Sequence, residues 1–146
     1  ATTIANGRVF DAFLDDDLDK ALMHGPTFTG NALACAAANA SLDLFETEPR
    51  LQQVKAIEAD LRSALEPCRT MKGAWGNVTD VRVRGAIGVV ELDGILDMNG
   101  LRARFIDQGC WIRPFGRIVY LMPAFTIARD DLAALTDTVV RVIGET

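Results

Sequence analysis

The feature that most constrains the fold is a valine-rich stretch at residues 78–92, with the sequence VTDVRVRGAIGVVEL. Apolar and polar residues alternate along it, which is the period of a β-strand with one buried face. Gly85 interrupts the alternation, so the stretch is predicted to form either two short strands or one long strand bent at that glycine. A sheet with one apolar face must be covered by other elements.

Helical patterns surround this stretch. Small residues dominate residues 31–45, which favours a helix that another element can approach closely. Thr47 is predicted to cap a second helix that has Pro49 in its first turn and stops at Pro67. Its expected apolar stripe is Leu51, Val54, Ile57 or Glu58, Leu61 and Leu65.

Two more helices are expected further along the chain, and a pair of strands lies between them. The apolar positions of the helices are Met98, Leu101, Phe105 and Ile106, followed by a C-cap at Gly109, and then Leu132, Leu135, Val139 and Val142. The segments WIRPF and RIVYLM are predicted to be strands joined through Gly116. The order of elements predicts an α+β fold, with helices over one face of a short antiparallel or mixed sheet.

Composition excludes several classes of protein. The 146 residues carry a net charge of −5 and scatter their 15 Lys and Arg residues, which argues against a nucleic-acid partner. The longest apolar runs fall far short of the roughly 20 residues that a membrane span needs. Three widely spaced cysteines and a single histidine fit neither a zinc site nor a disulfide framework, so we expect a cytoplasmic protein without a metal.

The loop HGPTFTGN, residues 24–31, leads directly into the first predicted helix. Its two hydroxyls, the amides around its glycines and the following helix N-terminus suit an anion. The plainer alternative is that Thr29 or Asn31 only caps the helix and that His24 is structural. The acidic residues Asp15, Asp16, Asp17 and Asp19 lack the pattern of a calcium loop and indicate a solvated helix end.

A second candidate site is the segment WIRPFGRIVYLMP, residues 111–123. Arg113 stands before a proline and beside aromatic residues, and its planar, permanently charged guanidinium can bind a carboxylate through two parallel hydrogen bonds. From the residues alone, a surface arginine paired with an acidic side chain is an equally good interpretation.

The stretches HGPTFTGNALACAAANASL, GAIGVVEL and GCWIRPFGRIVYLMP together resemble the C-terminal third of class III, fold-type I, pyridoxal-phosphate aminotransferases. The resemblance covers nearly all of the chain from about residue 23 onward. It implies that residues 1–46 are the end of a large domain, with a cofactor-phosphate loop and a linking helix. Residues 47–146 would then be the small C-terminal α+β domain.

The resemblance also implies site residues. In a homodimer, Pro26 and Thr27 would contact the 5′-phosphate of pyridoxal phosphate in the neighbouring subunit, and Gly25 would lie against the substrate. Arg113 would bind the substrate carboxylate. Phe115 and Tyr120 would line the same pocket.

The implied reaction is transfer of the amino group of S-adenosylmethionine to 8-amino-7-oxononanoate, giving 7,8-diaminononanoate in biotin biosynthesis. Lys20, Lys55 and Lys72 do not stand in the context of the Schiff-base lysine, so this chain is expected to be inactive alone and to contain no catalytic residue. We expect it to self-associate, because the alanine-rich helix would leave an uncovered apolar face. The alternatives are another class III transaminase and a non-catalytic carboxylate-binding or structural module.

Overall fold

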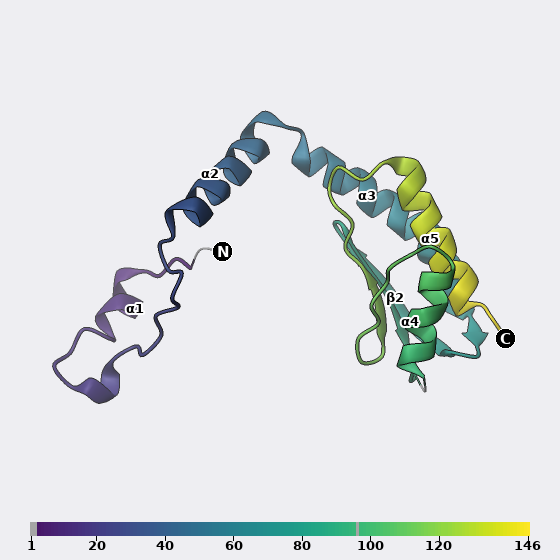
Figure 1. The fold of residues 1–146 in the computed structure, drawn as a ribbon, viewed down its shortest axis with the longest axis horizontal. Helices are drawn as coiled ribbons and strands as arrows, with labels where there is room; N and C mark the ends of the chain where they lie inside the picture. The colour runs from purple at the N-terminus through teal and green to yellow at the C-terminus, as the bar shows by residue number, and fades with distance from the viewer. Residues whose placement is uncertain (1–2, 96) are drawn as a thin grey trace. The chain divides into compact units, whose positions relative to one another are not determined.

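The computed structural model describes residues 3–95 and 97–146. The chain divides into two compact units, Ala1–Glu48 and Pro49–Thr146, and each is described by itself (Figure 1). None of the helices in the described ranges is long and apolar enough to cross a lipid bilayer.

The first unit contains α1 (Gly7–Asp11), the short 3-10 helix η1 (Leu18–Lys20) and α2 (Ala32–Thr47). Asn31 caps α2, because its side-chain oxygen accepts a hydrogen bond from the backbone N–H of Ala34 at 3.0 Å. The capping role expected of Thr29 or Asn31 therefore belongs to Asn31. All the side chains of residues 3–48 are exposed, so α2 forms through its alanine content and its cap rather than through a core.

The second unit contains the helices α3 (Arg50–Leu65), η2 (Glu66–Thr70), α4 (Met98–Asp107) and α5 (Arg129–Ile143). Its strands are β1 (Lys72–Gly73), β2 (Gly76–Arg84), β3 (Ile87–Leu92) and β4 (Ile118–Leu121). They form one sheet in the order β1-β2-β3-β4, with every neighbouring pair antiparallel. The predicted α+β class is confirmed, and the valine-rich stretch forms two strands. Arg84 pairs with Ile87 across the turn at Gly85, whose φ of +55° suits glycine.

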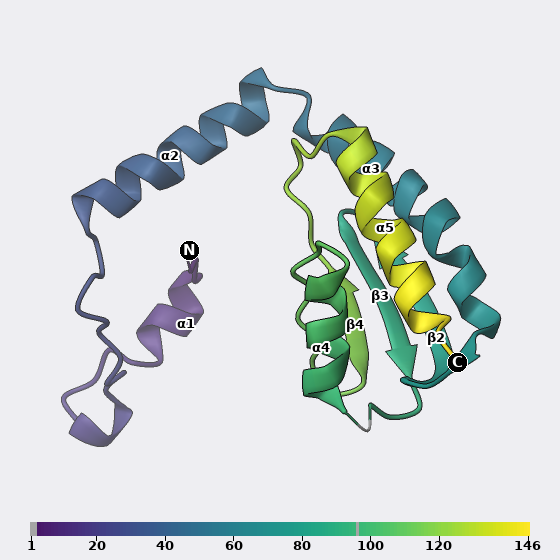
Figure 2. The same ribbon diagram turned by 45° about the vertical axis from the view of Figure 1, so that its right-hand side comes forward.

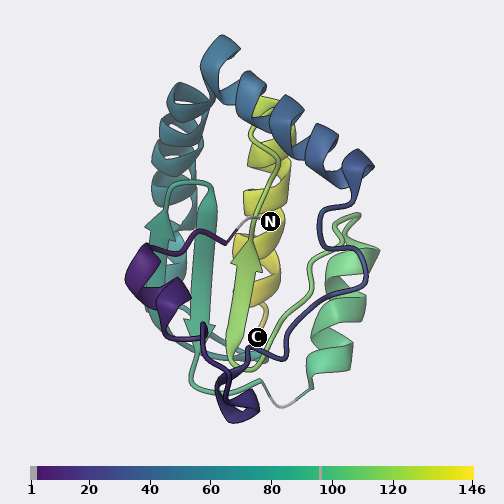
Figure 3. The same cartoon turned by 90° about the vertical axis from the view of Figure 1, so that its left-hand side faces the viewer.

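The core lies between the sheet and its helices. Helices α3 and α5 lie side by side across one face of the sheet (Figures 1 and 2), and the strands stand in front of them in Figure 3. Burial of an aliphatic or aromatic side chain contributes about 1.5–3 kcal/mol. The most deeply buried positions come from three helices and two strands: Leu61, Leu65, Val90, Leu92, Leu101, Phe105, Val119, Val139, Val142 and Ile143.

Three local predictions are wrong. Thr47 does not cap α3; it ends α2, where its hydroxyl donates to the carbonyl of Asp43 at 2.8 Å. Helix α3 begins after Pro49 without a side-chain cap, and Leu51 on its first turn is exposed rather than buried. The core-facing residues of α3 are Ile57, Leu61 and Leu65, so its first turn lies outside the core.

The third error concerns WIRPF, which is not a strand. Only Phe115 joins the sheet edge, through an isolated bridge in which Phe115 and Ile118 exchange two hydrogen bonds of 2.9 Å. Pro114 has no N–H to donate to a ladder, and this explains why pairing does not extend toward Trp111.

Candidate functional site

The first group of predicted site residues, Gly25, Pro26 and Thr27, lies in the exposed loop between η1 and α2. Two backbone hydrogen bonds shape the loop: Thr29 N–H donates to the carbonyl of Pro26 at 2.9 Å, and Asn31 N–H donates to that of Phe28 at 3.1 Å. The N–H and hydroxyl of Thr27 have no partner among residues 3–95 and 97–146. Two donors on one residue are therefore available to an external anion.

A hollow of about 540 Å³ lies beside this loop, lined by Pro26, His24, Thr29 and Asn31 together with the first turns of α2. Gly25 and Thr27 do not line it. The part of the chain that the structure describes holds no cluster of His, Cys, Asp and Glu able to bind a metal ion. The donors at this loop are hydroxyl and amide groups, which suit a phosphate.

The second group of predicted site residues is Arg113, Phe115 and Tyr120. The positions of Arg113 and Phe115 depend on which residues of the segment 110–115 are buried in the core. Ile112 and Pro114 are buried, whereas Trp111, Arg113 and Phe115 are exposed. Although this segment is not a strand, its residues alternate between the core and the solvent. The alternation leaves the side chains of Trp111, Arg113 and Phe115 exposed to solvent.

A depression of about 250 Å³ brings Arg113 together with Tyr120 of β4. Trp111, Met122 and Pro123 also line it, and Phe115 does not. Trp111 and Met122 belong to the candidate segment 111–123, but the sequence predicted no individual role for either residue. The signal for Trp111 was present in the spacing of WIR, where Trp111 and Arg113 stand two residues apart.

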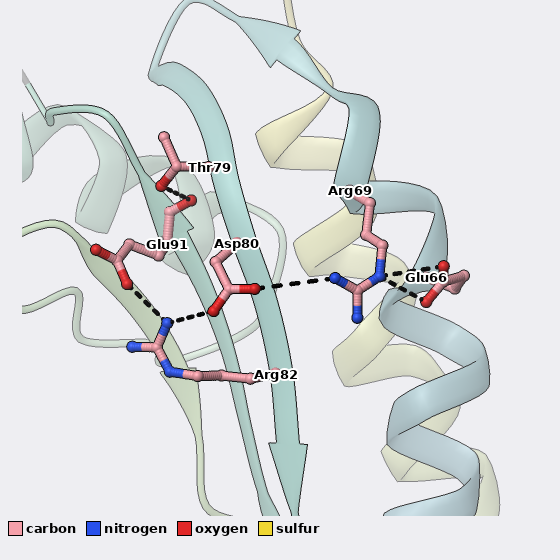
Figure 4. A network of polar contacts seen from close by, with 6 residues as sticks. All are labelled: Glu66, Arg69, Thr79, Asp80, Arg82 and Glu91. Atoms are coloured by element: carbon pink, nitrogen blue, oxygen red, sulfur yellow. Dashed lines mark hydrogen bonds and ion pairs between the residues drawn. The ribbon is translucent and has the colours of Figure 1, made fainter.

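Arg113 differs from the arginines of the nearby sheet face because it has no partner. Figure 4 shows Arg82 donating to both Asp80 and Glu91, at 2.8 and 2.6 Å. Arg117 also pairs with Glu91, at 2.9 Å. Arg113 forms no hydrogen bond or ion pair with any residue in the described ranges. Of the two sequence interpretations of Arg113, this environment favours a guanidinium that is available to a ligand.

The charges in Figure 4 hold one another in their ionised forms. The hydrogen bond from Arg82 holds the pKa of Asp80 below its ordinary value, and Asp80 in turn raises the pKa of Arg82. Arg69 extends the chain of charges by contacting Glu66 and Asp80. This network joins η2 to the sheet and has a structural role.

The remaining reactive side chains are poorly placed for covalent chemistry. Burial raises the pKa of the Cys68 thiol to about 11, so it stays protonated at neutral pH. Lys20, Lys55 and Lys72 are all exposed, and Lys20 pairs with Asp15. No lysine in the described ranges lies in a buried, apolar setting.

Comparison with known proteins identifies the class of this chain. The family model for aminotransferase class-III matches residues 1–143, so the chain belongs to the class III aminotransferase family, which confirms the resemblance noted in the sequence.

The curated relatives and solved structures show which aminotransferases the chain is similar to. The chain is 41% identical over 135 residues to the adenosylmethionine-8-amino-7-oxononanoate aminotransferase of Corynebacterium glutamicum; the match covers 92% of this chain and 31% of that protein. The crystal structure of the enzyme of the same name from Methanocaldococcus jannaschii superposes with a TM-score of 0.70 at 27% identity, covering 85% of this chain and 30% of that one.

Another solved structure, the ornithine aminotransferase of Toxoplasma gondii, has a TM-score of 0.68 at 27% identity and covers 84% of this chain and 29% of that one. The chain therefore spans about a third of the length of the relatives that it matches.

Proposed function

We propose that this chain is part of an enzyme that transfers the amino group of S-adenosylmethionine to 8-amino-7-oxononanoate, giving 7,8-diaminononanoate in biotin biosynthesis. Family membership and the name of the 41% identical relative support this proposal. The structural observation that carries it is Arg113, an unpaired guanidinium in a depression shared with Tyr120. A substrate that ends in a carboxylate needs such a group.

We assign residues 1–46 to the end of the large domain and residues 47–146 to the small C-terminal domain of this longer enzyme. The coverage of about a third of each relative supports the assignment. The Schiff-base lysine would lie in the rest of the enzyme, since the three lysines here are exposed. The 146-residue chain is then inactive by itself.

The residues of the first unit would hold the cofactor across a homodimer. Thr27 would donate from its N–H and hydroxyl to the phosphate of pyridoxal phosphate in the neighbouring subunit, Pro26 would contact the same phosphate, and Gly25 would lie against substrate. When bound, this cofactor supplies the electron sink that transamination requires. The two unpartnered donors of Thr27 fit a phosphate, which supports the assignment.

The residues of the second unit would orient the substrate. Arg113 would bind its carboxylate through two hydrogen bonds, and Tyr120 would line the same depression. Phe115 is exposed two residues beyond Arg113 and outside the lining of the depression, and in the longer enzyme it would add an apolar wall to the substrate pocket. These contacts determine where the ketone of 8-amino-7-oxononanoate lies and leave the proton transfers to the rest of the enzyme.

The proposal includes a cytoplasmic location, which rests on the cysteine pattern, and homodimerisation of the longer enzyme. Self-association of the isolated chain is proposed from the apolar side chains of α2, because Leu33 is 83% and Leu42 is 64% exposed.

Steady-state kinetics of the longer enzyme would test the function. Replacing Arg113 with Ala should raise KM for 8-amino-7-oxononanoate by about 10- to 150-fold, the equivalent of a charge-assisted hydrogen bond of about 1.5–3 kcal/mol. Arg117→Ala is the matched control, because Arg117 is already paired with Glu91 and should leave KM unchanged. An unchanged KM in Arg113→Ala would overturn the role of Arg113.

Two alternatives have distinct outcomes in the same assay. The superposition with an ornithine aminotransferase favours another class III transaminase as the second candidate, and turnover of ornithine in place of 8-amino-7-oxononanoate would establish it. The third outcome is that borohydride reduction traps no pyridoxal phosphate on a lysine of the longer protein. That result would instead support a non-catalytic module.

A further inference from the structure

We propose that Trp111 is a specificity-determining residue of the Arg113 site, and that its indole binds the hydrocarbon chain of an aliphatic carboxylate. The inference rests on the proposed role of Arg113 as the carboxylate ligand and extends it to the rest of the ligand.

Trp111 and Arg113 line the same depression, and both lie on the outward side of a segment whose alternate residues, Ile112 and Pro114, are buried. With Ile112 only 3% exposed, the backbone between the two side chains is fixed to the core. A ligand held by Arg113 therefore meets the indole two residues away.

Trp111 is 86% exposed, more than any other described tryptophan, tyrosine or phenylalanine, whereas the only other tryptophan, Trp75, is partly buried against the core. A ligand that covers the apolar face of an exposed indole removes that face from water. This burial makes the free energy of ligand binding more favourable.

Arg113 supplies the only charge among the residues of the depression, and Met122, Pro123 and Leu135 continue the apolar surface that begins at Trp111. One cation beside an apolar wall suits a carboxylate attached to a hydrocarbon chain. A compact polyanion such as inorganic phosphate would leave that wall uncovered.

An NMR titration of the 146-residue chain tests the proposal. The chain has two tryptophans, so its spectrum contains two indole N–H signals, which Trp75→Phe and Trp111→Phe assign. The probes are butanoate, hexanoate and octanoate, with octyltrimethylammonium as a cation of similar chain length. We expect carboxylates to shift the Trp111 indole and the Arg113 Nε–H while Trp75 stays in place.

The decisive readout is chain length. Each fully buried methylene increases affinity roughly fourfold, so affinity should rise by at least about fourfold from butanoate to hexanoate and again to octanoate. Trp111→Ala should flatten this series and keep the Arg113 shift. Phe10→Ala removes an exposed aromatic ring from the other unit and should leave the series unchanged.

The outcomes separate the two assignments. An Arg113 shift with no dependence on chain length, or a series that survives Trp111→Ala, overturns the role of Trp111 alone. An Arg113 Nε–H that no carboxylate moves, or equal binding by Arg113→Ala, overturns the carboxylate role of Arg113 and with it the structural basis of the proposed function. A Trp111 shift of equal size with octyltrimethylammonium also counts against the proposal, because it would show binding without the guanidinium.

Discussion

The two units of the chain are stabilised in different ways. In Pro49–Thr146, helices and strands far apart in the sequence bury a shared core, whereas all the side chains of residues 3–48 are exposed. Helix α2 is as long as α3, with 16 residues each, but only α3 contributes side chains to a core. Equal helix length therefore conceals a large difference in what stabilises each helix.

Hydrogen exchange should show the largest difference between the units. Opening of a small domain costs about 5–15 kcal/mol, whereas an isolated helix is marginal in water. We expect the amide of Val90, in the central strand β3, to be protected at least about a thousandfold more than that of Ala38 in α2. Equal protection in both units would show that α2 is stabilised by contacts outside its own helix.

A pair of leucines within α3 sharpens the comparison. Leu61 is 0% exposed and Leu51 is 69% exposed, although both lie on the same helix. Leu61→Ala should destabilise the second unit by about 2–5 kcal/mol because it leaves a cavity, and Leu51→Ala should change stability by less than about 0.5 kcal/mol. Urea unfolding followed by circular dichroism measures both, and similar losses would contradict the assigned core.

Self-association tests the uncovered surface of the first unit. Leu33→Glu together with Leu42→Glu places charges on exposed positions of α2 and should weaken association by about tenfold or more. Sedimentation equilibrium over a range of concentrations measures the effect. Leu51→Glu adds a charge to an exposed leucine of the second unit and is the control. A monomer at the highest concentration of the unmodified chain would refute the expectation.

The smallest effect concerns the charge network of the second unit. The pKa of Asp80 is lowered in the folded state, mainly by the hydrogen bond from Arg82, so its contribution to stability is present above its unfolded pKa of about 4. That contribution is lost as the pH falls through the lower, folded pKa. Arg82→Gln should move the carboxyl titration of Asp80 back toward its ordinary value.

Carbon-detected NMR would record this titration. Arg8→Gln removes the same charge from the first unit and should leave the Asp80 titration in place. If Arg82→Gln leaves the Asp80 titration unchanged, another group holds the carboxylate ionised. The stability difference between Arg82→Gln and the unmodified chain should also disappear in strong acid, where Asp80 is protonated in both.

Most of the fold of the second unit could be predicted, because the apolar positions of its sequence patterns are the positions that are buried in the structure. Val81, Val83 and Val90 alternate in the sequence and face the core in the structure. The errors occurred where local propensity has no tertiary support or is opposed by covalent geometry. Thr47 is a good cap residue placed at the wrong end of a helix, and Pro114 prevents the strand that its aromatic neighbours favour.

The candidate site could be predicted in part. The charge and setting of Arg113 are visible in the sequence, but its lack of an acidic partner is a property of three-dimensional packing. Trp111 belongs to the same segment, but tryptophan is highly buried on average, so the sequence did not indicate its exposure. The structure shows it, because Trp111 is exposed while Ile112 and Pro114 are buried.

The attachment of residues 111–115 has a consequence for how such an enzyme can diversify. Because the segment joins the sheet only through Phe115, replacing Trp111 or Arg113 removes no strand and breaks no ladder of backbone hydrogen bonds. Under the roles proposed above for these two residues, inherited changes there would alter the preferred substrate while the protein still matures and accumulates in the cell. The proposal thus makes substrate preference and folding yield nearly independent traits in this part of the chain.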